Sequence, residues 1–245
     1  MDGPWNWERV EETGSTNEDL KKRKEAPHGT ALIARRQRGG KGRLGRQFSS
    51  PEGGLYLSLL LRPEAKPEEL LHLTVMAAVA VRRGILDCCG VEAGIKWPND
   101  LVYGNRKLCG ILTELVTEEG TSPRVIIGVG LNCNTVPEEV RNMATSLGEI
   151  TGKQMDIDDL AAAILQALSE MDRQLLSGKN RYLREYESAC VSIGKQVQLI
   201  RGDERIFAYA LGIDENGGLL LRYSDGSEGL VNTGEVSVRG MYGYL

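Results

Sequence analysis

The sequence predicts an α/β (α+β) fold in which helices flank a mixed β-sheet and a small β-barrel follows. Two observations carry this prediction. Through residue 190, apolar runs of strand length are interspersed with longer stretches of helical periodicity. From residue 191 onward, short segments of alternating polarity are separated by glycine-containing turn signals. We therefore predict a boundary near Val191, between a domain of residues 1–190 and one of residues 191–245.

Two helices are predicted in the first ninety residues from their end signals as well as their periodicity. The first covers residues 15–24, because Ser15 can cap it and Glu18 follows at the capping-box spacing. The second covers residues 67–89 and ends at Gly90, a residue that readily adopts the left-handed conformation. Two further helices are predicted later in the chain, at residues 156–178 and 182–190.

Strands are predicted where short apolar runs lie between turn residues. Strands are expected at residues 30–34, 55–61 and 124–132. Residues 95–116 are expected to form two more, joined by a turn at Gly104 and Asn105. The barrel strands are expected at residues 197–200, 207–211, 219–223 and 229–231, with turns at 202–203, 216–218 and 225–226.

Composition excludes several classes of protein. The formal net charge of −4 argues against a chain that binds DNA over its whole surface. Apolar runs stay below the roughly 18 residues of a membrane span, and the N-terminus lacks the apolar core of a signal peptide. The five cysteines show no metal-binding spacing, so we expect free thiols in a reducing cytoplasm. Only two histidines occur, which makes a histidine-based triad or metal site an unfavourable interpretation.

The first chemical motif is the glycine- and arginine-rich segment 39–50. Six basic residues and no acidic residue occur from Arg35 to Arg46. Glycines expose backbone N–H groups, and guanidinium groups bind phosphate oxygens in pairs, so the segment suits a polyphosphate or an acyl phosphate. It lacks the P-loop spacing. A solvated basic turn and an RNA-binding segment remain alternative interpretations.

The second motif is Lys96-Trp97-Pro98-Asn99-Asp100, followed by the strand that contains Lys107. Lysine, asparagine and aspartate together can bind a phosphate, a sugar hydroxyl and a magnesium ion. Lys107 interrupts an otherwise apolar strand. It is either a charge on an edge strand, which is the commoner case, or a buried functional cation.

Two shorter motifs are ambiguous by themselves. Gly128 and Gly130 lie inside a predicted strand, where glycine marks either the close approach of another group or a β-bulge. The tripeptide Ser15-Thr16-Asn17 either caps a helix or offers hydroxyl and amide groups to a polar ligand such as a urea ring.

Taken in order, these segments resemble the biotin–protein ligase family. That family is marked by an STN tripeptide, a GRGRxGR loop, a KWPND strand end, a KLxGIL strand and a GxGxN strand end. The similar segments here are 15–17, 40–46, 96–100, 107–112 and 128–132. The resemblance is close over residues 13–132 and looser beyond. It implies a class II synthetase or biotin ligase-like catalytic domain that binds biotin and ATP, followed by an SH3-like barrel.

The resemblance assigns roles residue by residue. It implies biotin contacts at Ser15, Thr16, Asn17, Gln37, Lys41, Gly42, Arg43, Lys107, Gly110, Leu112 and Gly128. It implies ATP contacts at Arg46, Phe48, Lys96, Asn99, Asp100 and Asn132, with Mg²⁺ held near Asp100. Lys107 and Arg43 would be the catalytic cations. Two positions depart from the family pattern: Lys41 replaces an arginine and so loses the bidentate fork, and Phe48 stands where tryptophan is common.

The implied activity is AMP-forming ligation, in which biotin becomes biotinyl-5′-AMP and is passed to a carrier lysine. The implied partner is the biotin carboxyl carrier protein of acetyl-CoA carboxylase or a related carboxylase, and the implied assembly is a monomer or homodimer. About a dozen residues precede Ser15, which is too few for the family's DNA-binding domain, so the resemblance is to the non-regulatory type without DNA binding.

Two other functions remain open from the sequence. A lipoate–protein ligase shares the fold superfamily and the chemistry, although the KWPND and KLCGIL segments favour biotin. A non-enzymatic RNA-binding module could use the basic loop and the barrel, but the negative net charge and the 5% aromatic content weigh against it.

Overall fold

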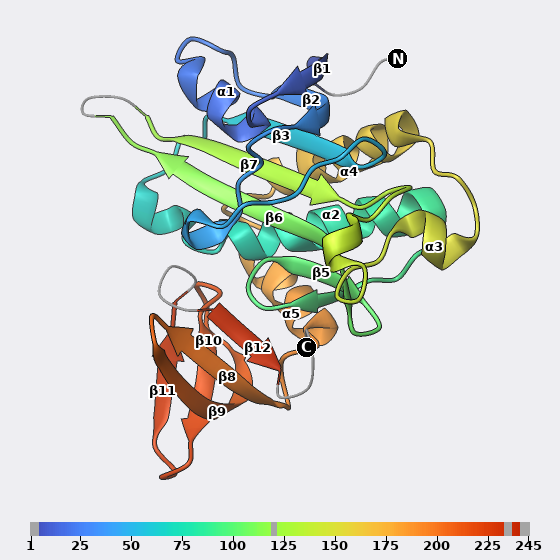
Figure 1. Ribbon diagram of the computed structural model, residues 1–245. Coiled ribbons are helices and arrows are strands. Elements are labelled where there is room, and N and C mark those ends of the chain that lie inside the picture. The colour runs from blue at the N-terminus through green and yellow to red at the C-terminus, as the bar shows by residue number, and fades with distance from the viewer. Residues whose placement is uncertain (1–4, 119–121, 233–236, 241–245) are drawn as a thin grey trace.

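The fold is described by a computed structural model, which covers residues 5–118, 122–232 and 237–240 (Figure 1). Its centre is a seven-stranded sheet with the order β1-β2-β3-β7-β6-β5-β4. The strands are β1 (Trp7–Thr13), β2 (Thr30–Gln37), β3 (Leu55–Leu61), β4 (Gly94–Lys96), β5 (Asp100–Tyr103), β6 (Arg106–Val116) and β7 (Arg124–Leu131). β1 and β2 pair in parallel and the other neighbours are antiparallel, so the predicted mixed sheet is confirmed.

Two long helices cover one face of this sheet. They are α2 (Leu73–Cys89) and α4 (Ile157–Asp172), which lie behind the strands in Figure 1. Gly84 allows them to pack closely, since a Cβ atom at this position would lie 2.8 Å from the Cα atom of Ile164. Gly90 ends α2 in the left-handed conformation, as predicted. α4 begins next to Asp156, whose side chain caps it. Most of the hydrophobic core lies between these helices and the sheet.

The opposite face of the sheet is covered by shorter pieces. Here α1 (Thr16–Lys22) and the segment 39–50 cross the strands (Figure 1). A small apolar cluster around Leu20, Leu32 and Leu60 fixes α1 to β2 and β3. The rest of this face is left to the segment 39–50 and to a pocket, which is why most of the apolar burial lies on the helix side.

Several predicted elements have different bounds in the structure. The first helix is shorter than residues 15–24, and within the described residues the Ser15 side chain makes no capping hydrogen bond. The helix predicted at 67–89 is divided into a 3₁₀ turn, Pro67–Leu70, and α2. Residues 95–116 form β4, β5 and β6 rather than two strands, because the chain turns at residues 97–99. The helix predicted to reach Gly178 ends at Asp172, and α5 (Lys179–Ala189) follows.

The C-terminal part forms a second, antiparallel sheet with the order β11-β10-β9-β8-β12. Its strands are β8 (Gln196–Arg201), β9 (Glu204–Ile213), β10 (Leu219–Tyr223), β11 (Glu228–Val231) and β12 (Ser237–Gly240). The four predicted strands are present, and β12 is an additional one that pairs with β8. One core cluster contains residues of both sheets, such as Ile95 and Leu219. The boundary near Val191 therefore stays a prediction.

Two further features bear on the protein class. The structure assigns Cys88, Cys89, Cys109, Cys133 and Cys190 as free cysteines, which agrees with the sequence prediction. Among the described residues, every helix is too short or too polar to cross a membrane.

Candidate functional site

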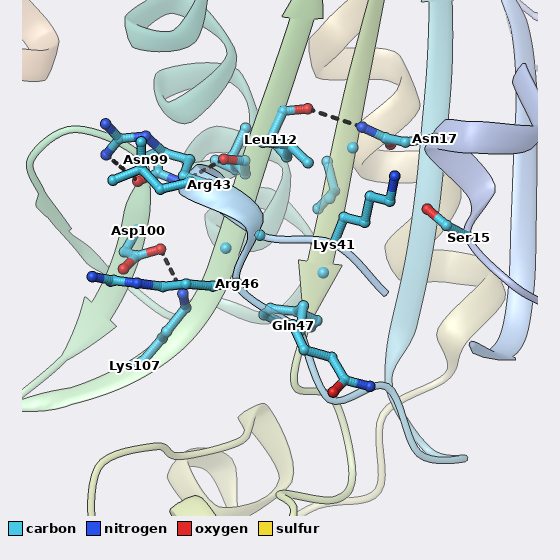
Figure 2. Close-up of a pocket in the computed structure, with 18 of the residues that line it drawn as sticks. Ser15, Asn17, Lys41, Arg43, Arg46, Gln47, Asn99, Asp100, Lys107 and Leu112 are labelled. Carbon is cyan, nitrogen blue, oxygen red and sulfur yellow. Dashed lines mark hydrogen bonds and ion pairs between the residues drawn. The ribbon is translucent and has the colours of Figure 1, made fainter. Parts of the chain in front are cut away.

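A pocket of about 430 Å³ lies on the sheet face opposite α2 and α4 (Figure 2). Its walls come from the start of α1, the segment 39–50, the turn at residues 97–99 and the middle strands β6 and β7. These segments are far apart in the sequence. The pocket brings together every predicted site residue except Asn132, so the motifs form one site rather than separate surface features.

One end of the pocket is lined by neutral polar groups. The backbone N–H of Thr16 donates to Gln37 Oε1 at 2.8 Å, and the Gln37 amide donates to Ser50 Oγ at 2.9 Å. The hydroxyl of the fully buried Ser58 lies 2.7 Å from Thr16 Oγ1 and donates to Asn17 Oδ1. These bonds fix the direction of several donors and acceptors in a nearly dry wall, which is how a site recognises a neutral polar ring.

Asn17 is held firmly from the other side as well. Its Nδ2 donates to Glu114 Oε2 at 2.8 Å and lies 3.4 Å from the carbonyl oxygen of Leu112 (Figure 2). A Cβ atom at residue 128 would lie 2.3 Å from Asn17 Oδ1, so only glycine leaves room for this side chain. β7 keeps continuous register with β3 and β6 through Gly128, so the glycine serves close approach and the β-bulge interpretation is wrong.

The other end of the pocket carries positive charge. Lys107 Nζ lies 2.7 Å from Asp100 Oδ1, and Figure 2 shows the two side chains facing each other beside Arg46. Lys107 belongs to β6, which pairs with β5 and β7, so the interpretation of this lysine as an edge-strand charge is wrong. The Phe48 ring lies 5.5 Å from Lys107 Nζ and provides an additional cation–π contact.

Arg43 lines the same end from the opposite wall. Its Nη1 lies 3.4 Å from Asn99 Oδ1, which is marked in Figure 2. Burial lowers the pKa of Arg43, while the charge of Asp100 raises it. An arginine pKa begins so high that this guanidinium remains charged at neutral pH. Arg46 and the buried Lys96 line the pocket too, so four cations surround one carboxylate.

The segment 39–50 folds over the pocket as a tight loop. The N–H of Gly42 donates to the carbonyl of Arg46 at 2.7 Å, and the N–H of Phe48 donates to the carbonyl of Gly40 at 2.8 Å. Leu44, at the tip, has φ of 56° and a side chain that is 57% exposed. A leucine in the left-handed region is strained, and an exposed one gains little from packing. The tip is therefore the least favourably held part of the site.

The turn at residues 97–99 is supported from behind the pocket. The buried Trp97 donates from Nε1 to the carbonyl of Gly217 at 2.9 Å, and Tyr186 Oη donates to the carbonyl of Pro98 at 2.9 Å. In front, Asn99 Nδ2 donates to the carbonyl of Ile111 at 2.7 Å. Asn99 and the neighbouring Asp100 are thus positioned by α5 and by the second sheet as well as by their own strand.

Asn132 is the predicted site residue that the structure places outside the pocket wall. It is buried, and its amide donates to the carbonyl of Thr145 at 3.1 Å and lies 3.4 Å from that of Lys107. It therefore holds the segment around Thr145 against the start of β6. Its ATP contact stays a prediction.

Other residues of the site were missed by sequence reasoning. Ser58 was overlooked, although a lone hydroxyl in the apolar strand β3 is a usable signal. Glu114 and Met143 gave no local signal, because their roles depend on contacts with distant segments. The remaining wall residues that were not predicted are Leu44, Gln47, Leu57, Trp97, Pro98, Ile111, Val129 and Gly130.

The donor groups limit which metal could bind. Among the described residues, the structure contains no cluster of three or more His, Cys, Asp or Glu side chains able to hold a metal. Asp100 is the one carboxylate among the described residues that line the pocket. Mg²⁺ commonly uses one or two carboxylates together with substrate phosphates, so this wall fits Mg²⁺ only if a polyphosphate is bound.

Comparison with known proteins places the chain among similar sequences. Residues 7–132 match the Biotin/lipoate A/B protein ligase family, and residues 192–239 match the Biotin protein ligase C terminal domain. The chain is 37% identical over 207 residues to the bifunctional ligase/repressor BirA of Bacillus subtilis, which covers 82% of this chain and 64% of that protein. The chain thus spans less than two thirds of that relative's length.

Relatives of more similar length are also found. The chain is 32% identical over 236 residues to the biotin–[acetyl-CoA-carboxylase] ligase of Mycobacterium tuberculosis, which covers 93% of this chain and 86% of that protein. Its fold is similar to that of the biotin protein ligase from Aquifex aeolicus solved in complex with biotin and ATP. The TM-score is 0.83 at 35% identity, over 96% of this chain and 99% of that one.

Proposed function

The chain belongs to the biotin/lipoate A/B protein ligase family, and from this premise we propose that it is an ATP-dependent biotin–protein ligase. It would convert biotin and ATP to biotinyl-5′-AMP and pyrophosphate, and then transfer the biotinyl group to a carrier lysine. The observation that carries the proposal is the division of one pocket into a neutral polar end and a cationic end. A ligand with a polar uncharged ring at one end and an anionic acyl phosphate at the other matches this division.

In the first step the biotin carboxylate attacks the α-phosphorus of ATP and pyrophosphate leaves. Two anions must approach each other, so fixed positive charge lowers the barrier. Lys107 and Arg43 face this end from opposite walls, with Arg46 and Lys96 nearby. The carboxylate is already ionised at neutral pH, so this step requires no general base, which suits a pocket whose described walls contain no histidine.

In the second step the amine of a carrier lysine attacks the acyl carbon of biotinyl-5′-AMP, and AMP leaves. The carrier lysine must lose one proton to become a nucleophilic amine, and a second proton leaves the nitrogen as the amide forms. Asp100 is the proposed acceptor, because it is the one carboxylate among the described residues that line the pocket. A phosphate oxygen of the adenylate is the alternative acceptor.

Mg²⁺ is proposed as a companion of ATP. Asp100 would help to hold it, and it would supply positive charge that offsets the charge of the departing pyrophosphate. Lys96 and Arg46 contribute charge at the same end without any metal.

The proposed acceptor is a biotin carrier protein of a carboxylase such as acetyl-CoA carboxylase. The support is the name of the Mycobacterium tuberculosis relative, the biotin–[acetyl-CoA-carboxylase] ligase. The match to this chain covers 86% of that protein's length. The pocket supplies no further information on the carrier, since an entering lysine would touch only its rim.

The test is pyrophosphate exchange into ATP with biotin, with lipoate or with no acid added, followed by mass spectrometry of a purified biotin carrier domain. We expect exchange and a carrier mass increase with biotin alone. Exchange with lipoate alone would support the lipoate ligase alternative. Salt-dependent binding of single-stranded RNA without exchange would reject both ligase activities.

A further inference from the structure

We propose that Glu18 is a positioning residue that anchors the basic loop over the pocket by its ion pair with Lys41. The proposal rests on the proposed function for its consequence in catalysis, but the anchoring itself can be tested without activity. Lys41 opens the tight loop, pairing with Gln47 through a backbone bridge, and Lys41 Nζ lies 2.9 Å from Glu18 Oε1. Glu18 sits in the first turn of α1, on the fixed part of the site.

Glu18 is the first link of a charged network. Lys21 Nζ lies 2.8 Å from Glu18 Oε1 and 2.6 Å from Glu114 Oε1, and Glu114 also accepts from Asn17. The network therefore joins the loop to the neutral polar end of the pocket through α1 and β6. The paired cations also keep the pKa of Glu18 low, so its charge is present at neutral pH.

The Glu18–Lys41 ion pair is placed where it can affect whether the loop is open or closed. The loop tip is strained at Leu44 and largely exposed, so its closed position depends on few contacts. The Glu18 and Lys41 side chains are 30% and 51% exposed, and an ion pair of that kind contributes little to global stability. A contribution too small to change folding is still large enough to shift a local opening equilibrium several-fold.

The position of Lys41 explains why its chemical type matters. An arginine at this position would bring a planar fork that suits a ligand phosphate, whereas a lysine is a compact point charge. Here that point charge is directed at α1 rather than at the cationic end of the pocket. Lys41 therefore serves the loop's attachment, whereas Arg43 and Arg46 line the pocket.

Limited trypsin digestion tests the anchor directly, because the loop contains cleavable bonds after Arg43 and Arg46. Peptide mapping would measure their cleavage rates in the wild type, Glu18→Gln, Lys41→Gln and the double variant. We expect Glu18→Gln to accelerate cleavage about two- to fivefold at low salt. In the Lys41→Gln background the same change should have no effect, since the two residues act as a unit.

Glu8→Gln is the matched control. Glu8 pairs with Arg23 at 2.8 Å on an exposed surface outside the pocket. Glu8→Gln therefore also removes one acidic group from a surface ion pair. We expect wild-type cleavage of the loop in this variant. The unfolding midpoint of Glu18→Gln should equal that of the wild type, which separates a loop effect from general destabilisation.

The catalytic consequence is measured by the release of biotinyl-5′-AMP from the enzyme in the absence of carrier. Release should accelerate about two- to fivefold in Glu18→Gln, and high salt should abolish the difference. Equal loop cleavage in the wild type and Glu18→Gln, or an undiminished effect of Glu18→Gln beside Lys41→Gln, would overturn the anchor. A wild-type enzyme that forms no adenylate would instead overturn the proposed function, and the digestion experiment would still decide the role of Glu18.

Discussion

The floor and the roof of the pocket are built in opposite ways. The floor is formed by β6 and β7, whose backbones are paired on both sides and whose apolar side chains face a buried core. The roof is the basic loop of residues 39–50, held by backbone bonds near its ends and by exposed ion pairs. The same pocket thus combines a surface that cannot move without unfolding and one that can move alone.

This difference assigns different tasks to residues of the same charge. Lys107 projects from the floor and is fixed by Asp100, so it can stabilise developing charge without reorganising. Arg43 projects from the roof, so its position depends on whether the loop is closed. We therefore expect floor substitutions to reduce adenylate formation and roof substitutions to reduce adenylate retention.

The largest effect is expected at the centre of the floor. Lys107→Ala should lower biotin-dependent pyrophosphate exchange by ~10²–10³-fold, because it removes a cation that Asp100 holds in position beside the reacting groups. Lys107→Arg, which keeps the charge on a different geometry, is the comparison variant. Exchange at the wild-type rate in a folded Lys107→Ala protein would remove this lysine from the mechanism.

Substitution of Gly128, which lies on the floor, should have the next largest effect. A Cβ atom in Gly128→Ala would lie 2.3 Å from Asn17 Oδ1, so the asparagine must leave its position. We expect biotin affinity, measured by calorimetry, to fall roughly five- to 150-fold, which corresponds to the 1–3 kcal/mol of a small-to-large change in a packed site.

Gly14→Ala is the control for this prediction. It lies beside the same tripeptide, but a Cβ atom there would have no neighbour within 4 Å among the described residues. Similar affinities for the two alanine variants would show that crowding at Asn17 is not what excludes a side chain at position 128.

The roof should respond in a different step. Arg43→Gly should release biotinyl-5′-AMP about tenfold faster or more, since the loop loses its contact with Asn99 and a charge that faces the acyl phosphate. Released adenylate would label lysines of bystander proteins, which mass spectrometry detects. If adenylate release stays slow while pyrophosphate exchange falls as in Lys107→Ala, then Arg43 contributes to adenylate formation as the floor residues do. That result would contradict the proposed difference between floor and roof.

Support from behind the floor should have a smaller effect. Trp97→Phe removes the N–H that donates to the buried carbonyl of Gly217, and an orphaned buried carbonyl costs about 1–3 kcal/mol of unfolding free energy. We expect a lower urea midpoint together with a few-fold rise in KM for ATP. An unchanged urea midpoint would show that water replaces the indole.

The smallest effect is expected from pH at the anchor of the roof. Hydrogen bonds from Lys21 and Lys41 lower the pKa of Glu18 from 4.5 to about 2. The ion pair stabilises the closed loop fully at a pH above the ordinary carboxyl pKa. This stabilisation is lost as the pH falls toward the lowered pKa of Glu18. The ratio of adenylate release rates between Glu18→Gln and the wild type should therefore stay constant from about pH 5 to pH 8. A ratio that approaches one within this range would mean that Glu18 titrates there.

Local sequence patterns predicted the parts of the fold whose cause is local. β3 was predicted with its observed bounds, because a seven-residue run that is apolar except for Ser58 suits a strand buried on both faces. The stop of α2 at Gly90 and the start of α4 near Asp156 were predicted for the same kind of reason. The turn between β4 and β5 was missed, because its supports, Tyr186 and Gly217, are distant in the sequence.

The candidate site divides in a similar manner. The pocket wall contains every predicted site residue except Asn132, because glycines and cations are conspicuous in apolar strands. Ser15 was predicted to cap a helix or to bind a ligand, and only the structure shows that its hydroxyl makes no cap within the described residues. Glu114 was missed, since a side chain's partner on a distant segment leaves no trace in its own neighbourhood. The ATP contact of Asn132 stays a prediction.

The most direct test of the central claim is a crystal structure of the chain with biotin and a non-hydrolysable ATP analogue. We predict that the ureido ring contacts Thr16, Asn17 and Gln37, and that the carboxylate and the α-phosphate meet between Lys107 and Arg43. A ligand bound in the reverse direction, or bound outside this pocket, would contradict the account.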